Sequence, residues 1–221
     1  MPKQDIKLLV FDWDGTLADS ELFIVNAMQA AIQQHDLEMR TRDEIRNIIG
    51  LGLMEAAAVL FPDQGQTKHQ LLTDSYRQHY SRSAKGKTIL FPDVIKTLAK
   101  LQKQDYKMAI ATGKSRKGLD NSLQETGTRD FFHVTRCADE TFSKPHPQML
   151  FDIMEQLFVG PENTIMIGDS EYDLLMARNA NVTPVAVSYG TQSRERLLEH
   201  NPVVCLDSLD QLPDWLACNN S

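Results

Sequence analysis

The chain of 221 residues is long enough for a hydrophobic core plus a modest second unit, and its composition, 42% hydrophobic and 24% charged, is typical of a globular protein. Its formal charge of −7 at pH 7 disfavours nucleic acid and anionic membrane surfaces as partners. No apolar run is long enough to cross a bilayer, no secretory pattern is present, and three scattered cysteines lack disulfide or metal-binding spacing, so we expect a cytoplasmic protein with reduced thiols.

The first predicted strand ends in two carboxylates. Residues 8–11 form an unbroken apolar run, and Asp12 and Asp14 follow it directly, with Gly15 and Thr16 behind them. A short apolar run bounded by turn residues predicts a strand buried on both faces of a parallel sheet. Carboxylates at the carboxyl end of such a strand lie where open α/β sheets bind ligands. This pair therefore predicts a site for a cation and an anionic substrate.

Residues 17–87 have helical periodicity and capping signals throughout, and we predict no strand among them. One signal is the capping-box pattern that opens at Thr41, with Glu44 three residues later. Helices are predicted at about 20–36, 41–50, 54–61 and 66–84.

From Phe91 onward, predicted helices and strands alternate. Strands are predicted at 106–112, 134–137, 164–168, 183–187 and 203–206, and helices at about 92–103, 115–126, 147–158 and 172–180. This alternation is typical of a parallel sheet covered on both faces, to which the first strand must also belong. We therefore predict an α/β core made of 1–16 and 88–221, with an all-helical domain inserted at 17–87.

The ends of the later strands add further polar side chains. Thr112 and Gly113 end the second strand, Asp169 ends the fourth with Asp173 one helical turn on, and Lys144 lies in a proline-rich loop before that strand. Each residue alone has an ordinary explanation as a cap, a turn or a solvated loop. Together, at one edge of a parallel sheet, they predict a carboxylate cluster that suits a hard cation, Mg²⁺ above all. The hydroxyl and the lysine suit a phosphoryl group bound beside it.

Four ordered segments resemble the motifs of the haloacid dehalogenase-like hydrolase superfamily: FDWDGTLADS, ATGKS, SKPHP and GDSEYD. The resemblance covers nearly the whole chain, and the helical insert resembles the cap of the phosphoglycolate phosphatase-like branch. It implies a Rossmann-like, doubly wound parallel sheet and phosphoryl transfer through an aspartyl-phosphate. It also implies Mg²⁺ as cofactor and a small phosphorylated metabolite as substrate.

The resemblance also implies roles for the acidic residues. Asp12 would be the nucleophile, and Asp14 would be the general acid that protonates the leaving oxygen and then the base that activates water. Asp12, Asp169 and the backbone carbonyl of Asp14 would bind Mg²⁺. Asp173 would orient the metal's surroundings or Lys144.

Further roles concern the phosphoryl group. Thr112 and the amides of Trp13 and Gly113 would bind its oxygens, and Lys144 would pair with both Asp12 and the phosphate. Gly113 replaces an asparagine that many relatives carry, so one side-chain contact is expected to be missing.

Several related chemistries fit less well. Dehalogenases of this superfamily have no acidic residue at the position that Asp14 occupies here. Phosphonoacetaldehyde-type hydrolases use a lysine of the cap, and the loop 50–53 contains no lysine. A receiver domain would have no large helical insert. A sugar phosphomutase usually carries a histidine soon after the first motif, and this chain has none there. A mutase and a catalytically silent binding protein remain the alternatives to a phosphatase.

The sequence leaves open which charged residues contact the substrate. The loop 50–53, which contacts the leaving group in the family, is uncharged here and favours a leaving group that is small or not strongly anionic. Two basic groups could change that expectation. The first group is Arg40, Arg42 and Arg46, and a solvated helix face is the favoured interpretation for it. The second, for which a solvated turn and a role toward an anionic substrate are equally favoured, is Lys114, Arg116 and Lys117.

Overall fold

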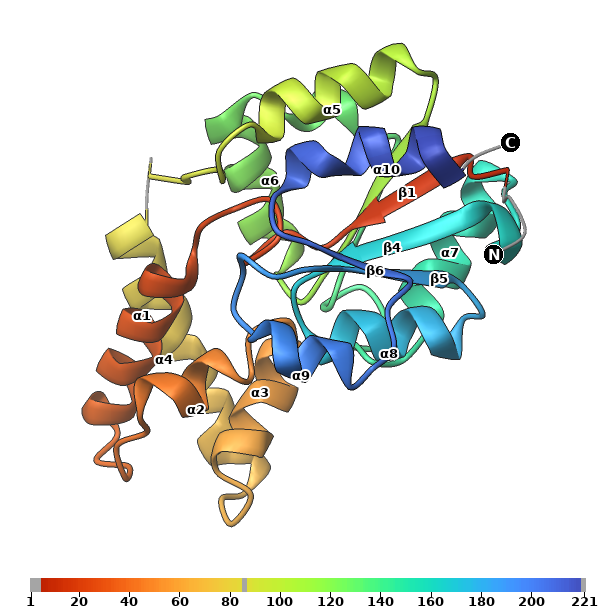
Figure 1. Ribbon diagram of the computed structural model, residues 1–221. Coiled ribbons are helices and arrows are strands. Elements are labelled where there is room, and N and C mark those ends of the chain that lie inside the picture. Colours follow the sequence, from red (N-terminus) through yellow and green to blue (C-terminus); the bar gives the residue numbers. More distant parts are fainter. Residues whose placement is uncertain (1–4, 85–86, 220–221) are drawn as a thin grey trace.

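The structure, a computed structural model, describes residues 5–84 and 87–219 (Figure 1). Its centre is a six-stranded parallel sheet with the order β3-β2-β1-β4-β5-β6. The strands are β1 (Leu8–Phe11), β2 (Lys107–Thr112), β3 (Val134–Cys137), β4 (Thr164–Gly168), β5 (Thr183–Val187) and β6 (Val204–Leu206). All the predicted strands are present, which confirms the α/β fold class. The first strand in the chain lies in the middle of the sheet.

Alternate residues of β1 face opposite layers of helices, as the two-residue period of a strand requires. Leu9 and Phe11 pack in a cluster with α5, α6 and α10, whereas Leu8 and Val10 pack with α7 and α8. Both faces are therefore apolar, which explains the unbroken run in the sequence. The covering helices are α5 (Val94–Lys103), α6 (Arg116–Thr126), α7 (Gln148–Leu157), α8 (Glu171–Asn179), α9 (Arg194–Leu198) and α10 (Leu212–Asn219).

Two of these helices, α9 and α10, were not predicted from the sequence. Helix α9 has five residues and buries only Leu197, so it is too short to produce a periodic pattern. Helix α10 packs Leu212 and Leu216 into the same cluster as α5. Three short 3-10 turns, also not predicted, lie at Arg129–Phe131, Pro161–Asn163 and Leu209–Gln211.

Of the five helices described between β1 and β2, the first four lie together beside the sheet, at the edge toward which its strands point (Figure 1). They are α1 (Glu21–Gln34), α2 (Arg42–Arg46), α3 (Leu53–Leu60) and α4 (Gln66–Ala84), and we call them the helical insert. The insert buries a hydrophobic cluster of its own, which includes Val25, Ile32 and Leu72.

The predicted capping box is present at the start of α2. The Thr41 amide donates to Glu44 Oε2 at 2.7 Å, and the Glu44 amide donates to Thr41 Oγ1 at 3.2 Å. The helix ends at Arg46, earlier than predicted, and residues 47–50 form a turn. Gly50 closes this turn at φ +107°, which is incompatible with a continuing α-helix.

The two stretches that join the insert to the core run side by side. The Asp19 amide donates to the Ile89 carbonyl at 2.9 Å, and the Phe91 amide donates to the Leu17 carbonyl at 3.0 Å. Among residues 5–84 and 87–219, none of the helices combines the length and the hydropathy needed to cross a bilayer.

Two neighbouring leucines of α4 test whether the insert's own cluster stabilises it. Leu72 is fully buried in that cluster, whereas Leu71 is 48% exposed. We expect Leu72→Ala to lower the free energy of unfolding by about 2–5 kcal/mol, because it leaves a cavity. The matched control Leu71→Ala should change it by less than about 0.5 kcal/mol. Urea unfolding followed by circular dichroism measures both, and equal losses would contradict the role of the cluster.

Candidate active site

Three carboxylates meet where β1 and β4 end. Asp12 follows β1, and its amide donates to the Ile167 carbonyl of β4 at 2.9 Å. Asp169 follows β4, and Asp173 lies in the first turn of α8. One carboxylate oxygen from each of the three acids lies within 4.8 Å of the others, and all three residues are buried. The strand order and register therefore bring together acids that are more than 150 residues apart in the sequence.

Lys144 lies between two of these acids. Its Nζ is 2.7 Å from Asp12 Oδ1 and 2.6 Å from Asp173 Oδ1, and the residue is only 1% exposed. Burial by itself would lower the pKa of Lys144, but the attraction of Asp12 and Asp173 outweighs it and raises the pKa. The lysine is therefore a fixed positive charge among three carboxylates.

Hydroxyls and amides hold the other carboxylate oxygens in place. Asp169 accepts hydrogen bonds from Thr16 Oγ1 at 2.8 Å and from the amide and Oγ1 of Thr191 at 2.8 and 2.7 Å. Asp173 accepts from the amide and Oγ of Ser170 at 3.1 and 2.6 Å, which also caps α8. The sequence analysis missed Thr191, because it lies in the loop after β5, where no periodicity or motif marks it.

Gly15 allows Asp169 to lie close to the first motif. It has φ +85°, and a Cβ atom at this position would lie 2.2 Å from Asp169 Oδ2. Any other residue would be strained and would displace the carboxylate. The glycine that follows Asp14 is thus required both by the turn and by the acid cluster.

The acid cluster fits a divalent cation. Asp12 Oδ2 is buried and has no hydrogen-bond partner among the residues that the structure describes. Burial raises the pKa of Asp12 well above its usual range; the attraction of Lys144 opposes this rise, and repulsion from Asp173 and Asp169 adds to it. Burial and the nearby Asp173 raise the pKa of Asp169 to about 6. Three acids beside one lysine leave an excess of negative charge, which a cation bound by oxygen ligands would neutralise.

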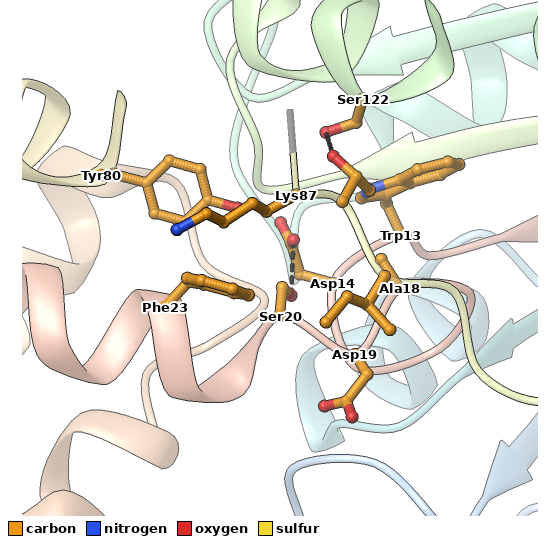
Figure 2. Close-up of a pocket in the computed structure, with 11 residues that line it drawn as sticks. Trp13, Asp14, Ala18, Asp19, Ser20, Phe23, Tyr80, Lys87 and Ser122 are labelled. Carbon is orange, nitrogen blue, oxygen red and sulfur yellow. Dashed lines mark hydrogen bonds between the residues drawn. The ribbon is translucent and has the colours of Figure 1, made fainter. Parts of the chain in front are cut away.

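Asp14 has different partners from Asp12. Its carboxylate accepts from Ser20 Oγ at 2.7 Å, at the start of α1 (Figure 2), and from Lys114 Nζ at 3.0 and 3.2 Å. Lys114 Nζ also donates to Tyr80 OH of α4 at 3.1 Å and lies 4.7 Å from the centre of that ring. The two acids of the first motif therefore pair with two different lysines.

The other two members of that basic group lie apart from Asp14. Arg116 donates to Glu140 and to Thr135, at the outer side of β3, and Lys117 is exposed. Of the three, only Lys114 is held against an acid of the first motif. The partners that distinguish it, Asp14 and Tyr80, could not be read from its place at the start of a predicted helix.

The end of β2 carries Thr112 and Gly113 directly beneath the insert. Thr112 is buried, and its Oγ1 accepts from the Lys114 amide at 3.2 Å. A Cβ atom on Gly113 would lie 2.4 Å from the carbonyl oxygen of Leu51 and 2.6 Å from that of Gly50. The insert's loop therefore leaves no room for a side chain at this position, so the asparagine that Gly113 replaces in the motif would not fit. Trp13, the residue between the two acids, buries its ring in the core.

A cavity of about 950 Å³ separates the insert from the edge of the sheet. Both acids of the first motif line it from the core. Its other lining residues include Thr112, Gly113 and Lys114 from the core, and Leu51, Met54, Tyr76 and Tyr80 from the insert. A second pocket, of about 10 Å³, lies behind Asp14 and has room for about one water molecule (Figure 2).

The first basic group lies away from this cavity. Arg40 donates to the Leu60 carbonyl and lies over the Phe61 ring, while Arg42 and Arg46 both pair with Glu21. None of the three is among the described residues that line the cavity. Their interactions are with the insert itself.

Comparisons with known proteins agree with this geometry. Residues 9–187 match the sequence model of the family described as haloacid dehalogenase-like hydrolase. The chain is 31% identical to a phosphoglycolate phosphatase of Psychrobacter arcticus, with 96% of each chain covered. It is 27% identical to the pyrophosphatase PpaX of Oceanobacillus iheyensis, with 94% of this chain and 95% of that protein covered.

The fold also matches solved structures. A hydrolase of the haloacid dehalogenase-like family from Streptococcus pneumoniae superposes with a TM-score of 0.83 at 23% identity, with 95% of this chain and 98% of that chain covered. The sequence match spans both β1 with its two acids and β4 with Asp169. The chain belongs to the haloacid dehalogenase-like hydrolase family, as its four motifs predict.

Proposed function

We propose that this protein is a Mg²⁺-dependent phosphatase that hydrolyses a small phosphorylated metabolite through an aspartyl-phosphate on Asp12. The observation that carries the proposal is the environment of that residue. Asp12 is buried at the end of the central strand, lines the cavity, and keeps one carboxylate oxygen without a hydrogen-bond partner among the described residues. The relatives named phosphoglycolate phosphatase and pyrophosphatase support a phosphoryl substrate.

The core and the helical insert have different proposed roles. We propose that 1–16 and 88–221 form the catalytic core and that 17–87 form a cap domain, which turns about the segment at Gly15 and Thr16. The separate hydrophobic cluster of the insert and the paired linkers support this division. Three unpaired cysteines are compatible with the cytoplasm, the compartment we propose.

The first half of the reaction uses Asp12 as the nucleophile. One of its carboxylate oxygens attacks phosphorus, the bond from phosphorus to the leaving oxygen breaks, and Asp14 gives that oxygen a proton. Thr112 and the amides of Trp13 and Gly113 bind phosphoryl oxygens. Lys144, already 2.7 Å from Asp12, offsets the charge that two anions bring together.

The second half releases phosphate. Asp14 takes a proton from a water molecule, the water oxygen attacks phosphorus, and the bond to Asp12 breaks, which frees the Asp12 carboxylate and leaves Asp14 protonated for the next cycle. Asp12, Asp169 and the backbone carbonyl of Asp14 would hold Mg²⁺, and Asp173 would keep Lys144 in position. Bound Mg²⁺ would supply positive charge that screens the carboxylate from the phosphate and fixes a phosphoryl oxygen.

Replacement of the nucleophile tests the covalent step. Asp12→Asn should lower kcat for phosphate release by at least about 1,000-fold, because the nucleophilic carboxylate is lost. Circular dichroism should show an unchanged fold. The exposed residue Asp63 gives a matched control, since Asp63→Asn makes the same chemical change far from the cavity. Wild-type turnover in Asp12→Asn would overturn the assignment.

Binding of Mg²⁺ can be tested without turnover. At a Mg²⁺ concentration about 100 times its Kd, binding to the folded state alone should stabilise the protein by about 2.7 kcal/mol. We expect MgCl₂ to raise the free energy of unfolding of the wild type, relative to EDTA at matched ionic strength. Asp169→Asn should abolish this gain. The same gain in both proteins would show that Mg²⁺ binds elsewhere.

A panel of phosphorylated metabolites tests the reaction type. With Mg²⁺ present, at least one small compound should release inorganic phosphate; the panel should include phosphoglycolate, sugar phosphates, nucleotides and pyrophosphate. Movement of phosphate within a sugar without release would instead identify a mutase. No turnover of any kind, with Mg²⁺ bound, would favour the silent binding protein.

A further inference from the structure

Lys114 differs from the other positive charges around the cavity. Arg77, Arg82 and Lys117 also line it, but all three are exposed, and Arg77 pairs with Asp74 at 2.7 Å. The side chain of Lys114 is only 9% exposed. Among the cavity-lining residues that the structure describes, it is the one cation withdrawn from solvent. A buried ammonium acts on a ligand with much less screening than an exposed one.

The contacts of Lys114 fix the position of its ammonium group and determine how many of its hydrogens can reach a ligand. Its ammonium has three donor hydrogens, and three acceptor atoms surround it: both carboxylate oxygens of Asp14, at 3.0 and 3.2 Å, and the hydroxyl of Tyr80, at 3.1 Å. The ring of Tyr80 also faces the charge, at 4.7 Å, and stacks on Tyr76 at 5.7 Å. The two Asp14 oxygens belong to one carboxylate and can share a single hydrogen, and in that arrangement one donor hydrogen is available to a bound molecule.

We propose that Lys114 determines specificity by binding an anionic group on the leaving part of the substrate. This rests on the proposed phosphatase function. The ligand class is a small phosphate compound whose leaving group carries a carboxylate or a second phosphate close to the leaving oxygen. The group would contact Lys114 directly, in the space between the core and the insert.

The position of Asp14 sets the reach of this contact. Lys114 Nζ lies 3.0 Å from Asp14 Oδ1, and a proton donor must lie within about 3 Å of the oxygen that it protonates. The ammonium is therefore within about 6 Å of the leaving oxygen. That span suits an anionic group on the adjoining carbon or its neighbour better than one at the far end of an extended leaving group.

Lys114 supplies a positive charge that the loop 50–53 lacks. That loop carries no charge, which favoured a leaving group without strong negative charge. The structure places a positive charge on the opposite wall of the cavity, at the end of β2. Lys114 of the core, rather than the insert's loop, would then bind the anion. The insert contributes Tyr80, whose hydroxyl accepts from Lys114.

A purely structural role for Lys114 is the competing explanation. Its contacts join Asp14 of the core to Tyr80 of the insert, so the lysine could simply clamp the two together. A clamp would affect all substrates alike. A specificity contact would affect only substrates that carry the anion, and the ratio of kcat/KM values separates the two.

Three phosphate monoesters of similar length make the test: carboxymethyl phosphate (phosphoglycolate), ethyl phosphate and 2-aminoethyl phosphate, assayed with Mg²⁺. The wild type should favour the carboxymethyl ester over the ethyl ester by roughly 10- to 100-fold in kcat/KM, as one hydrogen bond to a charged group provides. It should disfavour the aminoethyl ester. Pyrophosphate tests a second phosphate as the anion.

Variants of Lys114 give the decisive comparison. Lys114→Met should remove the preference for the carboxymethyl ester, chiefly through KM, while Lys114→Arg should retain most of it. Lys117→Met removes an exposed charge three residues further along and separates a specific contact from general attraction of anions. Tyr80→Phe removes the hydroxyl partner of the lysine and should leave the preference intact.

The outcomes are distinguishable. An equal loss on all three esters in Lys114→Met, or an equal loss of preference in Lys117→Met, would overturn the role of Lys114 and leave the phosphatase assignment standing. A wild type that hydrolyses the ethyl and carboxymethyl esters equally well would do the same. A wild type that hydrolyses no phosphate compound would overturn the proposed function itself.

Discussion

The site depends on the charge balance around Lys144. Three buried carboxylates would repel one another strongly without a neutralising partner, and the lysine touches two of them, Asp12 and Asp173. Hydrogen bonds from Thr16, Thr191 and Ser170 stabilise further carboxylate oxygens. The balance is incomplete, since one positive charge faces three acids. The fold thus holds the carboxylates together while leaving a place where a cation is favourable.

The sheet topology explains why this balance can exist at one point. β1 is the central strand and pairs with both β2 and β4, so its end lies beside Thr112 on one side and Asp169 on the other. The chain leaves the core soon after Asp14 to form the insert. The stretch that enters the insert pairs with the stretch that returns from it. Its loop then comes to lie on Gly113. The same short segment therefore supplies the acids and places the wall of the cavity opposite them.

Local patterns were enough to predict the sheet and most of the acid cluster. Apolar runs locate the strands, and parallel strands must end at a common edge, so Asp12, Asp169 and Asp173 could be grouped from the sequence, with Lys144 added from the loop before β4. Thr191 could not, because a loop threonine carries no pattern and its role depends on contact with Asp169. Helix α9 was missed because five residues cannot show a period. The surroundings of Lys114 were also unreadable, since they depend on how α4 packs against the core.

The pairing of each acid of the first motif with its own lysine bears on how two carboxylates so close in sequence can do different chemistry. Asp12 lies among other acids with Lys144, fully buried, where a cation and a phosphoryl group would meet. Asp14 faces the cavity with Lys114, Ser20 and the insert around it. Successive residues along an extended chain point in opposite directions, but residues two apart would point the same way. The chain bends at Trp13, whose carbonyl accepts from the amides of residues 16–18, and the two carboxylates then meet different lysines. The helical insert thus reaches Asp14, the acid proposed to transfer the proton, through Lys114 and Tyr80, while Asp12, the proposed nucleophile, is held by the core alone.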